Sequence, residues 1–133
     1  MTLDELNQLL QPIFPGLMGV RLVEATPEKI VATMQVRPDL CTSGRVLHGG
    51  AYMAFADTLG AVGTLLNLAP GTRTTTIESK TNFLGAAPEG TRVTGESAPL
   101  HRGKTTMLWQ TRISNERGKL IAVVMQTQMV LPA

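Results

Sequence analysis

The stretch GRVLHGGAYMAFADTLGAVGTLL, which runs from Gly44 to Leu66, decides the fold. From about Gly50 to Leu68 the residues are almost all apolar or small, and a Pro-Gly pair follows. The sequence therefore predicts a buried helix of about five turns. Asp57 interrupts the run as its one formally charged side chain, so the run falls short of the about 20 apolar residues of a membrane span.

Asp57 has helical neighbours that offer no polar face for it to join. The residues three and four positions away along a helix are Met53, Ala54, Gly60 and Ala61. A helical aspartate usually lies on a solvated stripe or caps another group, and that reading stays open. The alternative is a carboxylate kept in an apolar setting for chemistry, because burying one without a partner costs about several kcal/mol.

The His48-Gly49-Gly50 start of the helix is the second element of the pattern. The first turn of a helix leaves N–H groups unpaired, and glycine permits a substrate oxygen to approach them closely. An oxyanion pocket at this point is one reading of the pattern. Plain loop geometry before a helix is the other.

The two elements lie too far apart on one helix to act on the same atom. Gly49 and Asp57 are eight residues apart, which is about 12 Å along a helix axis. A two-fold dimer with antiparallel helices would set the helix start of one subunit beside Asp57 of the other, making two composite sites. Gly60 and Gly63 fit such close packing, because glycine in a helix costs roughly 1 kcal/mol against alanine and indicates that a backbone or ligand comes close.

The rest of the chain reads as one short helix and six strands. A capping box at Thr2 and Glu5 opens an amphipathic helix that stops between Pro12 and Pro15. Alternating residues predict strands over 16–27, 28–38, 72–84, 91–100, 104–114 and 119–131. Short, turn-rich connections join the last four strands and favour antiparallel neighbours. The order predicts an α+β fold in which a sheet wraps around the helix.

The last two predicted strands show the clearest alternation. Odd-numbered positions from 107 to 113 and from 121 to 129 form one face of each strand. These positions hold Trp109 and most of the larger apolar side chains of the two strands.

Composition narrows the class of protein. With 43% hydrophobic and 17% charged residues, residues 1–133 are expected to form a single domain that covers more apolar surface than one small subunit needs, which predicts an oligomer. The net charge of +2 is scattered and aromatic residues are few, which argues against nucleic acid as a partner. Cys41 is the only cysteine, and neither a secretory leader nor a membrane span is recognisable, so we expect a cytoplasmic protein.

The sequence resembles the hotdog-fold thioesterases of the phenylacetate-degradation and 4-hydroxybenzoyl-CoA type. The most specific part is LHGGAYMAFAD, in which His-Gly-Gly is followed after six residues by an acidic residue. The segments TIESKTNFLGAAPEG and LHRGKTTMLWQTRI resemble the strand after the helix and the following hairpin, and the resemblance runs from Leu17 to Leu131. It implies an antiparallel sheet wrapped around a long central helix.

The resemblance implies an enzyme that hydrolyses an aryl- or medium-chain acyl-CoA thioester to free acid and CoA. Asp57 would act as nucleophile or as base for water, while the Gly49 N–H polarises the carbonyl. His48 would orient the carbonyl or hold the loop. Related enzymes place Asn or Gln six residues before that histidine to align the water or substrate; here Thr42 stands in that position, and Thr42 or the neighbouring Ser43 is the substitute.

The resemblance also implies which residues contact the substrate. These are Gly50, Thr58, Asn82, Arg102, Gly103 and Lys104. The chain has no phosphate loop of the GxxxxGK type, and the charges of Arg102 and Lys104 suit the phosphate oxygens of CoA, with solvated turn charges as the alternative. We expect no metal and no cofactor beyond the CoA of the substrate, no membrane partner, and a homodimer with composite sites that pairs into a homotetramer.

Two other functions stay open on sequence grounds. A dehydratase or hydratase on the same architecture would use a histidine and an acid on the acyl chain of an acyl-CoA or acyl-carrier protein, yet its usual Gly-Pro-rich signature is missing. A non-catalytic acyl-CoA-binding module is the second, because fold alone does not fix function. Cys41 has no base nearby in sequence and is not expected to be a nucleophile. Four large side chains are expected in the core: Met53, Phe55, Phe83 and Trp109.

Overall fold

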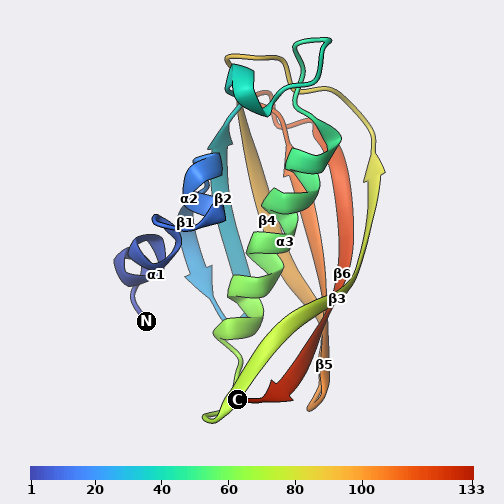
Figure 1. Ribbon diagram of the computed structural model, residues 1–133. Helices are drawn as coiled ribbons and strands as arrows, with labels where there is room; N and C mark the ends of the chain where they lie inside the picture. Colours follow the sequence, from blue (N-terminus) through green and yellow to red (C-terminus); the bar gives the residue numbers. More distant parts are fainter.

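The long helix predicted from the sequence is present as α3 (Gly49–Leu65), and an antiparallel sheet of six strands curves around it (Figure 1). The computed structural model describes all residues from Met1 to Ala133. The other elements are α1 (Leu3–Leu10), α2 (Phe14–Met18), β1 (Arg21–Thr26), β2 (Lys29–Gln35), the 3-10 turn η1 (Pro38–Leu40), β3 (Thr72–Phe83), β4 (Arg92–Arg102), β5 (Thr106–Ser114) and β6 (Leu120–Pro132). The predicted α+β hotdog fold is confirmed.

Helix α3 begins and ends where side chains satisfy its backbone. His48 is the N-cap, and its Nδ1 accepts the Gly50 N–H at 2.8 Å. At the other end, Asn67 Nδ2 donates to the Gly63 carbonyl oxygen at 2.8 Å. The helix stops before the predicted end at Leu68 because the Asn67 amide satisfies a carbonyl that a further turn would have used. Neither α3 nor any other helix is both long and apolar enough to cross a membrane.

The inner face of α3 packs against the sheet through its glycines. A Cβ atom at Gly60 would collide with the Gln126 side chain of β6, and one at Gly63 would collide with the Trp109 ring of β5. From the other side, a Cβ atom at Gly95 of β4 would crowd side chains of the helix. The prediction that a partner backbone or a ligand approaches Gly60 and Gly63 is wrong, because these glycines admit side chains of the same chain's sheet.

The strands follow the order β1-β2-β4-β5-β6-β3, and every neighbouring pair is antiparallel. β3 therefore pairs with β6 at one edge of the sheet, whereas β4 lies between β2 and β5. The prediction that β3 and β4 are joined as neighbours is wrong. Residues 84–91 instead cross from the edge strand to the interior of the sheet, and the Leu84 and Gly85 N–H groups donate to the Ile121 carbonyl oxygen at 2.8 and 3.1 Å.

The N-terminal segment holds one more helix than the sequence analysis predicts. The capping box of Thr2 and Glu5 opens α1 as expected. Residues 16–20, expected to begin a strand, belong instead to α2 and to the turn that ends it at Gly19, whose φ of 81° is left-handed. Pro15 favours this helix, because its fixed φ suits the first turn and its missing N–H is not needed there.

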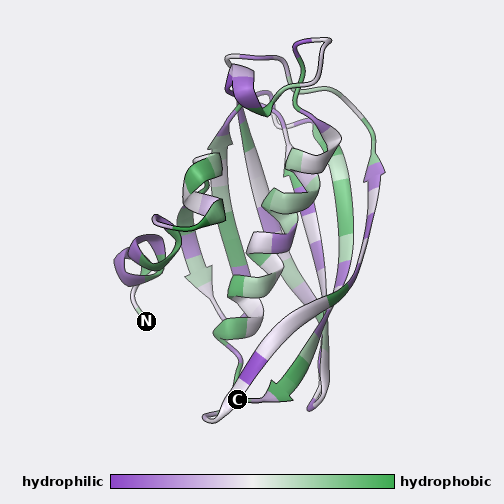
Figure 2. Cartoon of the chain, in the orientation of Figure 1, coloured by the Kyte–Doolittle hydropathy of each residue, from purple (hydrophilic) through white to green (hydrophobic).

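The core lies between α3 and the concave face of the sheet. Phe55 and Trp109 are fully buried there, as predicted. Met53 and Phe83 are 39% and 50% exposed, so their assignment to the core is wrong. The Phe83 ring packs edge-on against the Tyr52 ring of α3, with 5.6 Å between the ring centroids, and is exposed on its remaining sides. In Figure 2 the hydrophobic colour is strong along β2 and α2, whereas α1 is largely hydrophilic.

The alternation of apolar residues marks the buried face of β5 but not that of β6. In β5 the odd-numbered positions from 107 to 113 are buried. In β6 the buried positions from Ala122 onward are the even-numbered ones, and two of them are the amides Gln126 and Gln128. When polar side chains of a strand face the core, the positions of its apolar residues indicate the wrong face as buried.

Candidate functional site

The start of α3 presents a backbone N–H that no group of the chain accepts. His48 Nδ1 accepts the Gly50 N–H, and the His48 carbonyl oxygen accepts the Ala51 N–H at 2.9 Å. The half-buried Gly49 has no acceptor for its N–H within the chain. The Phe83 ring lies beside it, 3.3 Å from where a Cβ atom at Gly49 would stand. This positive end of the helix therefore offers a free donor to an oxygen of a ligand.

Asp57 is half-buried on the side of α3 that faces β3 and β6. Its Oδ1 accepts hydrogen bonds from Thr76 Oγ1 at 2.6 Å and from Gln126 Nε2 at 3.0 Å. Its Oδ2 accepts no hydrogen bond from the chain. The expectation of a purely apolar setting is wrong, because the strands supply polar partners that the helix itself lacks. The carboxylate is anchored through one oxygen and free at the other.

The free donor and the carboxylate lie along one seam, between α3 and the edge strand β3. Phe83 at the end of β3 lies beside Gly49, and Thr76, seven residues earlier in β3, contacts Asp57. The eight-residue separation along α3 corresponds to about 12 Å, as the sequence predicts. The outer edge of β3 pairs with no strand of the chain.

A pocket of about 380 Å³ adjoins the same helix start. Its walls come from α2, η1 and the first turns of α3, and its lining is mostly apolar: Phe14, Leu17, Met18, Leu40, Cys41, Ala51 and Ala54. Two of these side chains, Phe14 and Leu17, are 58% and 70% exposed. Large apolar side chains left exposed around a pocket suit an apolar ligand.

Three of the predicted site residues, two substrate contacts and the catalytic candidate Thr42, have other surroundings. Thr58 Oγ1 donates to the Ala54 carbonyl oxygen one turn earlier in α3, at 2.9 Å. Asn82 Oδ1 accepts a hydrogen bond from Lys80 Nζ at 2.9 Å on the exposed surface of β3. Thr42 is exposed in the loop before α3, and its side chain makes no hydrogen bond within the chain. None of the three side chains bonds to Asp57 or to the helix start.

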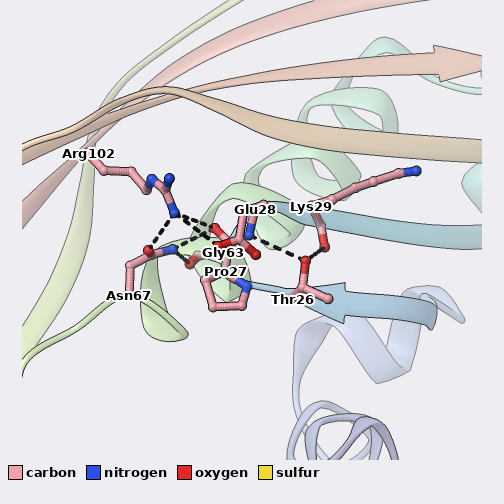
Figure 3. Close-up of polar contacts among 7 residues, drawn as sticks. All are labelled: Thr26, Pro27, Glu28, Lys29, Gly63, Asn67 and Arg102. Atoms are coloured by element: carbon pink, nitrogen blue, oxygen red, sulfur yellow. Dashed lines mark hydrogen bonds and ion pairs between the residues drawn. The ribbon is translucent and has the colours of Figure 1, made fainter.

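Arg102, Gly103 and Lys104 lie at the C-terminal end of α3, away from the free donor. Arg102 belongs to β4 rather than to a turn, and Figure 3 shows its guanidinium beside Asn67 and Glu28. Its Nη1 is 3.3 Å from Asn67 Oδ1 and 3.6 Å from Glu28 Oε1, so this side chain ties β4 to the end of α3 and to the β1–β2 turn. Lys104 is exposed and makes no ion pair, so of the two predicted cations it is the one that is free for a ligand.

Comparison with known proteins identifies the family. The family model described as "Thioesterase superfamily" matches residues 44–122. The chain belongs to the thioesterase superfamily. It is therefore a thioester hydrolase, as the sequence predicts, whereas the narrower phenylacetate-degradation or 4-hydroxybenzoyl-CoA type stays a prediction.

Individual relatives of this thioesterase agree with the assignment. Over 130 residues it is 30% identical to the 1,4-dihydroxy-2-naphthoyl-CoA hydrolase of Escherichia coli, covering 98% of this chain and 95% of that enzyme. A Deinococcus radiodurans protein is 35% identical over 103 residues, and the match covers 77% of this chain and 64% of that protein. The chain is also similar to the crystal structure of a thioesterase from Haemophilus influenzae, with 30% sequence identity and a TM-score of 0.93. This match covers 99% of this chain and 92% of that chain.

Sequence reasoning misses three residues of this thioesterase that surround Asp57. They are Thr76 of β3 and the β6 amides Gln126 and Gln128, which lie 19, 69 and 71 positions further along the chain. The sequence signal that could have found the two glutamines is their position in β6, because both lie on the same face of the strand as the apolar Val124. Two amides on the apolar face of a strand indicate a buried polar group opposite them.

The surroundings of Cys41 agree with the prediction that it is not a nucleophile. Desolvation raises the pKa of the Cys41 thiol, and the nearby carboxylate of Glu89 raises it further. The Sγ donates to the Arg37 carbonyl oxygen at 3.3 Å. Both effects disfavour the thiolate, which is the nucleophilic form of a cysteine.

Proposed function

We propose that this thioesterase hydrolyses an acyl-CoA thioester, with Asp57 as nucleophile or general base and the Gly49 N–H as the donor that polarises the carbonyl. The observation that carries the proposal is the Asp57 carboxylate, anchored through Oδ1 and free at Oδ2. It shares its seam of α3 with a backbone donor that has no acceptor. Such a carboxylate has an oxygen ready to take a proton from water or to bond to carbon.

Two subunits complete one site in this proposal. The reacting carbonyl group has to lie about 3 Å from both the carboxylate and the N–H donor. Asp57 and Gly49 of the same helix lie about 12 Å apart, so they do not meet this condition together. A second copy with its α3 antiparallel brings its own Gly49 beside Asp57. The unpaired edge of β3, next to the seam, supports such an assembly. We further propose that these dimers pair into a tetramer and act in the cytoplasm without a cofactor.

The geometry permits two routes of hydrolysis. In the general-base route, water gives a proton to Asp57 while its oxygen bonds to the carbonyl carbon; the C–S bond then breaks and the CoA thiolate takes up that proton. In the nucleophilic route, Asp57 Oδ2 bonds to the carbon and the CoA thiolate leaves. Water then hydrolyses the resulting anhydride, which restores the Asp57 carboxylate and frees the acid, and a proton released by this water goes to the thiolate. Negative charge develops on the carbonyl oxygen in both, and a donor such as the Gly49 N–H is worth roughly 3 to 4 kcal/mol there. His48 keeps the helix start in place through its bond to Gly50.

The pocket beside α2 supports an apolar acyl group, either aryl or medium-chain. It adjoins the helix start, since His48 and Gly50 contribute to its lining, and Phe14 and Leu17 supply an apolar wall. The Escherichia coli relative is named for an aromatic acyl-CoA, which supports aryl thioesters as the first substrates to test. For the CoA phosphates we propose Lys104, because Arg102 is already bonded within the chain.

Thiol release from a panel of aryl- and medium-chain acyl-CoAs tests the proposal. Asp57→Asn is expected to lower kcat by at least about 100-fold, because the amide neither takes the proton nor attacks carbon. Asp4→Asn is the matched control, since Asp4 is an exposed carboxylate in α1 far from the seam, and its turnover should equal that of the wild type. Undiminished turnover by Asp57→Asn on a substrate that the wild type cleaves would refute the assignment.

A further inference from the structure

We infer that Gln126 and Thr76 are positioning residues for the reaction: they fix the Asp57 carboxylate, and Gln128 fixes Thr76 in turn. The inference rests on the proposed function, in which Asp57 acts on the thioester. Gln126 and Gln128 are 1% and 0% exposed, so neither side chain reaches a substrate directly. Their effect on the reaction passes through the carboxylate.

The hydrogen bonds of this group run in one direction, toward Asp57. Gln128 Nε2 donates to Thr76 Oγ1, and Thr76 Oγ1 donates to Asp57 Oδ1 at 2.6 Å. Gln126 Nε2 donates to the same carboxylate oxygen at 3.0 Å. Because a hydroxyl carries one proton, the amide that donates to Thr76 leaves this proton for the carboxylate. Two donors on Oδ1 fix the rotation of the carboxylate and leave Oδ2 for water or substrate.

Packing alone does not account for an amide at position 126. The Gln126 Oε1 atom is buried without a hydrogen-bond partner, which is unfavourable for a polar group. The amide also requires Gly60 opposite it, where any Cβ atom would collide with the amide, and glycine is unfavourable inside a helix.

An aliphatic side chain in this place would avoid both costs, as its buried neighbours Ala122 and Val124 on the same strand do. The amide instead donates to Asp57: Gln126 Nε2 lies 3.0 Å from Asp57 Oδ1 and 3.4 Å from the Asp57 carbonyl oxygen. A core position that sacrifices stability to hold one carboxylate is typical of a functional site.

Near-isosteric variants separate positioning from a structural role. Thr76→Val removes the hydroxyl and keeps the shape, and Gln126→Met removes the amide. Each is expected to lower kcat about 10- to 100-fold, because each removes a hydrogen bond to a charged group, while KM changes less than about two-fold. Thr76→Ser keeps the hydroxyl and is expected to restore kcat to within about three-fold of the wild type.

The Tm of Gln126→Met distinguishes the two roles, because a positioning role and a structural role predict opposite changes in it. Gln126→Met is expected to keep or raise the Tm, because it removes the unpartnered Oε1 atom from the core. A residue that only supports the fold would lose Tm together with kcat. Thr111→Val is the matched control: its buried hydroxyl donates to Ser97 Oγ at 2.9 Å without contacting Asp57, so kcat should stay at the wild-type value.

Combination with Asp57→Asn completes the experiment. If the two residues act through the carboxylate, adding Thr76→Val or Gln126→Met to Asp57→Asn lowers the residual rate no further. Wild-type kcat in both single variants, alongside an inactive Asp57→Asn, overturns the inference and leaves the proposed function intact. A wild-type chain that cleaves no thioester of the panel overturns the proposed function and this inference with it. If Gln126→Met does not fold, the comparison of Thr76→Val with Thr76→Ser decides.

Discussion

At the scale of single residues, the roles proposed for Gly49 and Asp57 differ in kind. In the proposed mechanism Asp57 acts through its side chain, so many substitutions are expected to remove its function. The role proposed for Gly49 belongs to its backbone N–H, which every residue except proline also carries. A conventional substitution at Gly49 therefore tests the space around the helix start and not the donor itself.

Replacement by proline tests the Gly49 donor directly. Gly49 is the first residue of α3, a position that accepts proline, and His48 before it has φ −64° and ψ 139°, which suits a residue that precedes proline. We expect Gly49→Pro to lower kcat about 100-fold or more through loss of the donor, with circular dichroism unchanged. Gly49→Ala is the control, because it keeps the N–H and places a Cβ atom 3.3 Å from the half-exposed Phe83 ring. Equal kcat values for the two variants would contradict the role of the donor.

The residues of the site could be predicted from the sequence only where they lie close together in the chain. Gly49 and Asp57 belong to one helix, so their spacing alone gives their separation. Thr76 and Gln126 reach Asp57 through pairing of β3 with β6, and local patterns do not contain strand pairing. The apolar residues of β6 moreover favour the opposite face, so the two amides read as exposed.

At the scale of elements, the long helix and all six strands follow from periodicity, because each leaves a local signature. Periodicity does not predict the crossover between β3 and β4, because its eight residues contain turn residues that are equally typical of a hairpin. Helix α2 is hidden for a related reason: five residues are too few for a period to show, and Pro15 and Gly19 mark it only through capping.

The packing of α3 on the sheet leads to a stability prediction for Gly63. Alanine gains up to about 1 kcal/mol of helix propensity there, but its Cβ atom would collide with the fully buried Trp109 ring. We expect Gly63→Ala to lower the free energy of unfolding by about 1 to 3 kcal/mol in urea denaturation followed by circular dichroism. Gly44→Ala serves as the control, because nothing lies within 4 Å of its added methyl group. A Gly63→Ala variant more stable than the wild type would show that helix propensity outweighs this contact.

At the scale of the whole molecule, the surface along β3 differs from the rest of the sheet. β3 has an unpaired edge, and large apolar side chains on it or just after it are exposed: Ile77 at 55%, Phe83 at 50% and Leu84 at 55%. Exposed apolar side chains beside an unpaired strand edge favour association with another chain. This surface adjoins the seam that holds Asp57 and the helix start, so association there would bring a second copy to the site.

Complementation between two inactive variants distinguishes a shared site from one confined to a single subunit. In a hybrid dimer of Asp57→Asn with Gly49→Pro, a shared arrangement pairs the intact carboxylate of one chain with the intact donor of the other in one of the two sites. Random mixing makes about half of the dimers hybrid, so we expect about a quarter of the wild-type activity in the mixture and about half in the isolated hybrids. Two different affinity tags isolate the hybrids, and thiol release measures their rate. If each site lies within one chain, every site in a hybrid lacks either the carboxylate or the donor, and tagged hybrids without activity would rule out the composite arrangement.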